Sequence, residues 1–88
     1  MKVGIVGLGL IGGSLARALK ASGAEVYGYD VQPLTLQFVQ MQGSCDGVLG
    51  EDNVQDCDCI FLAIPPRAAE EWLNSHAEEI GKKEMPLP

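Results

Sequence analysis

Features of membrane and secreted proteins are missing from this 88-residue sequence. No apolar run approaches the ~20 residues that a membrane-spanning helix needs. The amino terminus carries a single basic residue, Lys2, and no cleavage-site pattern, so it does not resemble a signal peptide. The length allows one domain at most. We therefore expect one small domain with no membrane partner.

Basic residues are scarce in the sequence. Six Lys and Arg residues face twelve Asp and Glu residues, which gives a formal net charge of −6. Proteins that bind nucleic acids or anionic membranes present a basic patch. The basic residues here are scattered, and none alternates with aromatic residues. We therefore expect no nucleic-acid partner, although backbone N–H groups could still hold one small anion.

Cysteines are few, and they do not form a recognisable metal or redox motif. An odd count of three without a signal peptide favours a reducing compartment, and we expect a cytoplasmic protein. Cys57 and Cys59 are separated by one residue, whereas zinc knuckles and thioredoxin-type sites use a two-residue spacing. We expect Cys45, Cys57 and Cys59 to be packing residues near a strand, and we expect no metal.

Apolar segments of two different periods alternate along the chain. Short apolar runs predict strands at 2–6, 24–29, 48–49 and 57–64. Helical periodicity predicts helices that begin near Ile11, at Pro33 and after Pro66. This alternation predicts an α/β fold with a parallel sheet of three to four strands and flanking helices.

The helical spacing also predicts which side of each helix is buried. In the first helix, the expected inward face consists of Ile11, Leu15, Ala18 and Leu19. In the second helix, it consists of Leu34, Phe38 and Met41.

The turn between the first strand and the first helix carries the G-x-G-x-x-G pattern. Its residues are Gly7, Leu8, Gly9, Leu10, Ile11 and Gly12. The first glycine allows the tight turn, the second lets a pyrophosphate approach the backbone, and the third lets the helix pack close to the strand. Free N–H groups near Leu10 and Ile11 would point at the phosphates. Because the pattern follows a predicted strand and opens a predicted helix, it predicts a dinucleotide-binding loop. A P-loop would need a Lys-Ser or Lys-Thr pair, and the sequence has none.

A second binding residue is predicted at the end of the second strand. Asp30 stands eighteen residues after Gly12, where an acid accepts hydrogen bonds from the adenosine ribose. Neither Val31 nor Gln32 is an arginine, so nothing offsets the repulsion of a 2′-phosphate, and NAD is favoured over NADP. We also expect Val31 to contact the cofactor. An alternative role for Asp30 is to cap the helix that begins at Pro33.

The end of the fourth predicted strand should border the same crevice. Ligands of doubly wound sheets bind outside the carboxyl ends of the strands. We therefore expect Ala63, Ile64 and Pro65 to form a wall against the cofactor. The only histidine, His76, is expected to be a packing residue on a helix that lies away from the glycine loop. No catalytic residue is predicted.

Residues 7–16, GLGLIGGSLA, resemble the nucleotide loop of the prephenate and arogenate dehydrogenases. Tyr29-Asp30 and the segment 58–65 also match the order of motifs in that family. The resemblance implies a partial Rossmann fold over residues 1–83, with a frayed tail at 84–88. It also implies an NAD(P)-dependent oxidative decarboxylation in tyrosine biosynthesis.

The resemblance further implies that the catalytic half of such an enzyme is absent from this chain. We therefore expect the chain to bind NAD but to be inactive alone. Two alternatives stay open. The chain could be a stand-alone nucleotide-binding module without catalysis, or a fragment of another Rossmann reductase of the hydroxyacid or pyrroline-carboxylate type.

The strand at 57–64 is the most apolar in the chain. In the doubly wound order its outer edge would lack a partner strand. Bare apolar edges pair with other chains. We therefore expect a homodimer through this edge.

Overall fold

The computed structural model describes residues 1–80, and the side chains of residues 1–78. The predicted tail at 84–88 and the end of the predicted domain lie outside the described residues. The elements are β1 (Lys2–Val6), α1 (Leu10–Ala21), β2 (Glu25–Tyr29), α2 (Pro33–Met41), β3 (Gly47–Val48), a 3₁₀ turn (Val54–Asp56), β4 (Cys59–Leu62), α3 (Pro66–Ser75) and α4 (Ala77–Ile80).

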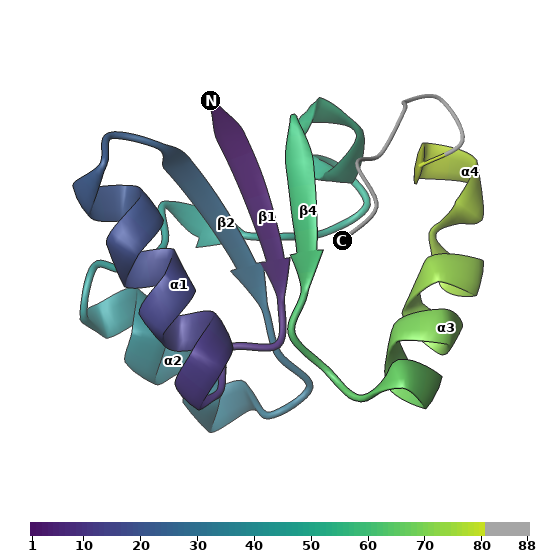
Figure 1. Cartoon of the computed structure of the whole chain (residues 1–88), viewed down its shortest axis with the longest axis horizontal. Coiled ribbons are helices and arrows are strands. Elements are labelled where there is room, and N and C mark those ends of the chain that lie inside the picture. The colour runs from purple at the N-terminus through teal and green to yellow at the C-terminus, as the bar shows by residue number, and fades with distance from the viewer. Residues whose placement is uncertain (81–88) are drawn as a thin grey trace.

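The four strands form one parallel sheet in the order β3-β2-β1-β4. The chain builds outward from β1 to β3 and then crosses to the other side of β1 to form β4. Helices α1 and α2 lie on one side of the strands, and α3 and α4 lie on the other (Figure 1). This arrangement confirms the predicted α/β fold with a partial Rossmann topology.

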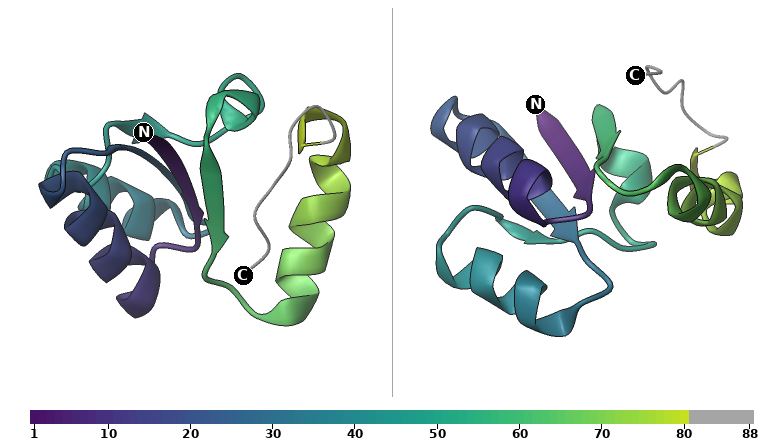
Figure 2. Two further views of the ribbon diagram at one scale, coloured as in Figure 1. Left: turned by 45° about the horizontal axis from the view of Figure 1, so that its top comes forward. Right: turned by 60° about the horizontal axis from the view of Figure 1, so that its bottom comes forward.

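Side chains of β1 alternate between two apolar clusters on opposite faces of the sheet. The first cluster consists of Val3, Ile5, Leu8, Ala16, Val26, Val39 and Cys45. The second consists of Val6, Leu49, Val54, Cys57, Ile60 and Trp72. Successive strand residues point to opposite faces, so a strand buried on both sides serves both clusters. The first cluster holds residues of α1 and α2, and the second holds Trp72 of α3, which lies alongside the β4 side of the sheet in both views of Figure 2.

The predicted inward face of α2 is wrong. Leu34, Phe38 and Met41 are 78%, 61% and 87% exposed. Val39 is buried instead, and Leu36 packs partly against the first cluster. This helix carries apolar residues on both sides and no charged residue. Its periodicity therefore predicts a helix without indicating which side the sheet covers.

The predicted inward face of α1 is wrong in part. Ile11 and Ala18 are exposed, whereas Leu15 and Leu19 pack against the first cluster as predicted. The buried centre of this face is Ala16, which is fully inaccessible to solvent. Close packing of the helix on β1 and β2 favours a small side chain at that point.

The last strand of the described residues, β4, is at an edge of the sheet, as predicted. Among the described residues, β4 pairs with β1 alone, and Phe61 on it is 37% exposed. The strand is shorter than the predicted 57–64. Cys45 and Cys57 are buried in the two apolar clusters, which confirms the packing role predicted for these two residues. Within residues 1–80 no helix combines the length and apolarity needed to cross a membrane.

Candidate dinucleotide-binding site

The glycine loop connects β1 to α1 at the carboxyl ends of the parallel strands. Gly7 has a φ of +96°, in the left-handed region that favours glycine. A Cβ atom here would also lie 2.5 Å from the carbonyl oxygen of Ala63. The N–H of Gly7 donates to the carbonyl of Tyr29 over 2.8 Å. The loop is therefore held between the ends of β2 and β4.

Packing within the protein requires glycine at position 12 of the motif but not at position 9. At Gly12 a Cβ atom would lie 1.7 Å from the carbonyl oxygen of Gly7, so close packing of α1 on the loop requires glycine. At Gly9 the φ is −70°, and a Cβ atom would meet no atom of the described residues within 4 Å. Neither backbone strain nor protein packing explains glycine at position 9. The space above Gly9 is open to a ligand.

The first turn of α1 faces the same open space. Gly9 is the N-cap residue, and no side chain caps the helix. The first intrahelical bond runs from the N–H of Gly13 to the carbonyl of Gly9. The N–H groups of Leu10, Ile11 and Gly12 therefore have no acceptor within the helix, which is the arrangement that binds phosphates. The side chains of Leu10 and Ile11 are exposed, whereas Leu8 is buried in the first cluster.

Asp30 ties the end of β2 to the glycine loop. One carboxylate oxygen accepts the N–H of Leu8 over 2.8 Å, and the other accepts the N–H of Gln32 over 2.8 Å. The N-cap of α2 is Gln32, and no side chain caps that helix, so the alternative role of Asp30 as an N-cap is wrong. An ionised carboxylate has about four lone-pair sites. Asp30 can therefore hold the loop and still accept hydrogen bonds from a ligand.

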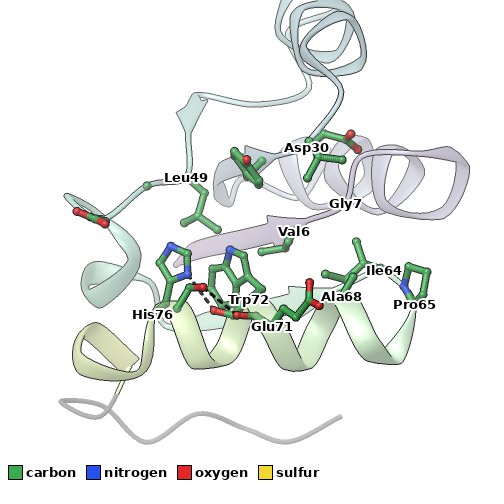
Figure 3. Close-up of a pocket in the computed structure, with 15 residues that line it drawn as sticks. Val6, Gly7, Asp30, Leu49, Ile64, Pro65, Ala68, Glu71, Trp72 and His76 are labelled. Carbon is green, nitrogen blue, oxygen red and sulfur yellow. Dashed lines mark hydrogen bonds between the residues drawn. The ribbon is translucent and has the colours of Figure 1, made fainter.

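A cavity of about 540 Å³ opens beside this loop, between the ends of the strands and α3 (Figure 3). It is lined by Val6, Gly7, Tyr29, Asp30, Val31, Leu49, Gly50, Glu51, Ile64, Pro65, Ala68, Glu71, Trp72, Ser75 and His76. Its volume lies within the range of small-molecule sites.

The cavity brings together five of the residues predicted from the sequence. They are Gly7, Asp30, Val31, Ile64 and Pro65. The remaining predicted residues, Leu8, Gly9, Leu10, Ile11, Gly12 and Ala63, do not line it. Ala63 lies beneath the loop, where its N–H donates to Val6 and its carbonyl faces Gly7.

One face of α3 lines the cavity, and the sequence analysis missed it. Ala68, Glu71, Trp72, Ser75 and His76 follow the spacing of a single helical face. The prediction that the helix of His76 lies away from the glycine loop is therefore wrong, because this residue and Gly7 line one cavity. The signal in the sequence is the helical spacing of these residues, together with the start of α3 directly after Pro65 at the crevice.

Among the residues that the structure describes, the charged side chains lining the cavity are all acidic. Asp30, Glu51 and Glu71 contribute carboxylates, and no lysine or arginine within residues 1–78 belongs to the lining. An anion in this cavity would meet repulsion from three side chains. The start of α1, where the helix dipole favours negative charge, is the exception.

A glycine loop and an acid at the switch point of a parallel sheet define a Rossmann-type nucleotide-binding domain. Residues 2–84 match the family described as "NADP oxidoreductase coenzyme F420-dependent", and the chain belongs to this family. No curated protein matches the chain.

Two solved structures are similar to the chain. Arogenate dehydrogenase from Synechocystis is 31% identical with a TM-score of 0.81, over 90% of this chain and 29% of that enzyme. UDP-N-acetylglucosamine 3-dehydrogenase from Acidithiobacillus ferrooxidans shares the fold at 15% identity, with a TM-score of 0.68, over 90% of this chain and 26% of that one.

The chain thus spans less than a third of the length of each of these two enzymes. The resemblance to the prephenate and arogenate dehydrogenases is confirmed for the nucleotide-binding part. The chain corresponds to the NAD(P)-binding portion of a dehydrogenase.

Proposed function

We propose that this chain binds NAD and forms the cofactor-binding part of a dehydrogenase that oxidatively decarboxylates prephenate or arogenate. The observation that carries the proposal is the position of Asp30. Its carboxylate accepts the N–H of Leu8 in the glycine loop and also lines the cavity. An acid in this position accepts hydrogen bonds from ribose hydroxyls.

The residues present fit such a cofactor at three points. The open space over Gly9 and the uncapped start of α1 suit the pyrophosphate. Asp30 suits the adenosine ribose. The apolar side chains of Ile64, Pro65 and Ala68 also line the cavity and suit the apolar faces of a nucleoside base.

The choice of NAD over NADP rests on charge. A 2′-phosphate on the ribose would lie beside Asp30, in a cavity that Glu51 and Glu71 also line. Within the described part of the chain, no lysine or arginine lines the cavity to neutralise that phosphate. The description of the family names NADP, and titration with both cofactors tests the preference for NAD directly.

The proposal gives binding roles, and no catalytic role, to the described residues. When bound, NAD would supply the hydride acceptor. The substrate class comes from the likeness to arogenate dehydrogenase. The segments that bind substrate and assist hydride transfer would come from outside residues 1–80, so we expect this chain alone to be inactive.

Calorimetric titration of the chain with NAD, NADP and AMP tests the proposal. We expect NAD and AMP to bind and NADP to bind at least about tenfold more weakly, because one uncompensated repulsion at close range costs about 1.4 kcal/mol or more. A folded chain that binds none of the three would refute the proposed function. Equal binding of NAD and NADP would refute the role of Asp30 in cofactor choice.

A second assay tests whether the chain alone has dehydrogenase activity. The chain is incubated with NAD and either prephenate or arogenate, and reduced cofactor is measured by its absorbance. We expect none to form. Turnover by the chain alone would show that residues given only binding roles here also support catalysis.

A further inference from the structure

Helix α2 presents apolar side chains to solvent along one side. Leu34, Phe38 and Met41 are 78%, 61% and 87% exposed, and Gln37, which is also exposed, lies between them. These four positions follow the i, i+3, i+4, i+7 spacing of a single helical face, which we call the outer face of α2. The right-hand view of Figure 2 shows α2 at the periphery of the molecule. A contiguous apolar surface of this kind marks an interaction site.

The opposite side of α2 already packs against the protein. Val39 is buried in the first apolar cluster, and Leu36 packs partly against it. At 3.6 residues per turn, these two positions lie on the side of the helix that is opposite the outer face. The outer face therefore cannot reach the sheet while Val39 stays buried, and its cover must come from another surface.

The distribution of charge indicates what that surface is. The chain has a formal net charge of −6, so two copies repel each other over most of their surface. No charged residue occurs between Asp30 and Asp46, so the whole of α2 is uncharged. A partner that docks by opposite charge finds nothing to pair with here, whereas a second copy meets no repulsion. The outer face of α2 is thus suited to self-association.

We infer that the outer face of α2 is a self-association surface, on which a second copy of this chain docks with its α2 antiparallel to the first. A two-fold axis through the middle of the face would place Leu34 opposite the partner's Met41. Gln37 suits a position beside this axis, because an amide both donates and accepts hydrogen bonds and can pair with an identical amide. Antiparallel helices also bring opposite ends of their dipoles together. The inference goes beyond the proposed function and does not depend on it.

The size of the outer face predicts a weak dimer. The three apolar side chains and Gln37 expose roughly 500 Å² on each copy, or about 1,000 Å² for the pair, which is the lower limit for a specific interface. Interfaces of this size are typical of transient complexes. We therefore expect monomer and dimer to exchange, with a dissociation constant on the order of tens of micromolar.

Sedimentation equilibrium over a range of concentrations measures this dissociation constant. In Phe38→Glu, a two-fold axis would oppose two carboxylates, and two aromatic rings would be lost from the contact. We expect the dissociation constant to rise at least about tenfold. The matched control is Gln40→Glu, which adds the same charge at an exposed position of the same helix that lies outside the outer face. We expect the control to keep the dissociation constant of the unchanged chain.

Folding of the variants is checked by circular dichroism. Phe38 and Gln40 are both exposed, so neither substitution buries a charge. If Phe38→Glu does not fold, Met41→Glu takes its place with the same expectation, because Met41 is 87% exposed on the same face.

A third variant distinguishes this surface from the edge of β4. Phe61→Glu places like charges at that edge and leaves α2 unchanged. Weaker association in Phe38→Glu, but not in Phe61→Glu, supports the inference. If both surfaces associate, the unchanged chain forms assemblies larger than a dimer, and Phe38→Glu reduces them to dimers, which also supports it.

Three results would overturn the inference. The first is an unchanged chain that stays monomeric at high micromolar concentration, in which case a different partner covers the outer face. The second is a folded Phe38→Glu chain that associates as tightly as Gln40→Glu. The third is loss of the dimer in Phe61→Glu alone, which would assign association to the edge of β4.

Discussion

Replacing Gly9 by alanine separates ligand binding from folding at the glycine loop. The φ of −70° is accessible to alanine, and the added Cβ would meet no atom of residues 1–80 within 4 Å. Alanine is a poorer N-cap residue than glycine, at a cost of about 0.5–1 kcal/mol. Restriction of the unfolded chain offsets about 0.4–1 kcal/mol of that cost. We therefore expect the free energy of unfolding to change by less than about 1 kcal/mol.

Binding should respond very differently to Gly9→Ala. The methyl group would occupy the space through which a pyrophosphate approaches the backbone, so we expect NAD affinity to fall at least about tenfold, or about 1.4 kcal/mol. Urea denaturation gives the stability, and calorimetric titration gives the affinity. AMP also carries a phosphate and serves as a second ligand.

Gly12→Ala is the informative contrast. Its Cβ would lie 1.7 Å from the carbonyl oxygen of Gly7, so α1 or the loop must move. Overpacking of this kind costs about 1–3 kcal/mol or more, and we expect loss of stability or failure to fold. The reasoning is refuted if Gly9→Ala binds NAD as the unchanged chain does, or if the two variants are destabilised equally.

Three further predictions concern charge and the edge of the sheet. Asp30→Asn should weaken NAD binding about tenfold or more and reduce the difference between the affinities for NAD and NADP, because a charged acceptor is lost. Calorimetric titration with both cofactors measures the two affinities. An unchanged ratio of these affinities contradicts the prediction. The Lys20 side chain, which donates to Asp46, and the N–H of Val26 hold the pKa of Asp46 below its ordinary value. The folded state therefore binds this proton less readily than the unfolded state, so the contribution of Asp46 to stability is present above about pH 4 and is lost as the pH falls through the lowered pKa. In acid denaturation, Asp46→Asn should therefore lose less stability than the unchanged chain as the pH falls. Identical acid transitions of the two proteins contradict this prediction. Within residues 1–80 the outer edge of β4 has no partner strand, and Phe61 on this strand is 37% exposed. We therefore expect sedimentation at high micromolar concentration to show a dimer, and a monomer alone would exclude it.

Local features of the sequence determined the order of elements and the chemistry of the loop. A strand of apolar residues, a glycine-rich turn and a periodic segment follow each other without a gap between Lys2 and Ala21. The requirement for glycine at Gly7 and the start of α1 at Leu10 arise within a few residues. Such short-range constraints are readable from spacing, as is the position of Asp30 at the end of β2.

Only the tertiary structure decided which surfaces are buried and which residues share the cavity. The exposed stripe of Leu34, Phe38 and Met41 has the same period as a buried one, because periodicity defines a face without its direction. The hydrogen bond from Leu8 to Asp30 joins residues 22 positions apart. His76 reaches the cavity because the chain crosses β1 between β3 and β4 and so places α3 on the opposite face of the sheet from α1. Contacts of this kind depend on strand order and crossover, which no single segment of the sequence encodes.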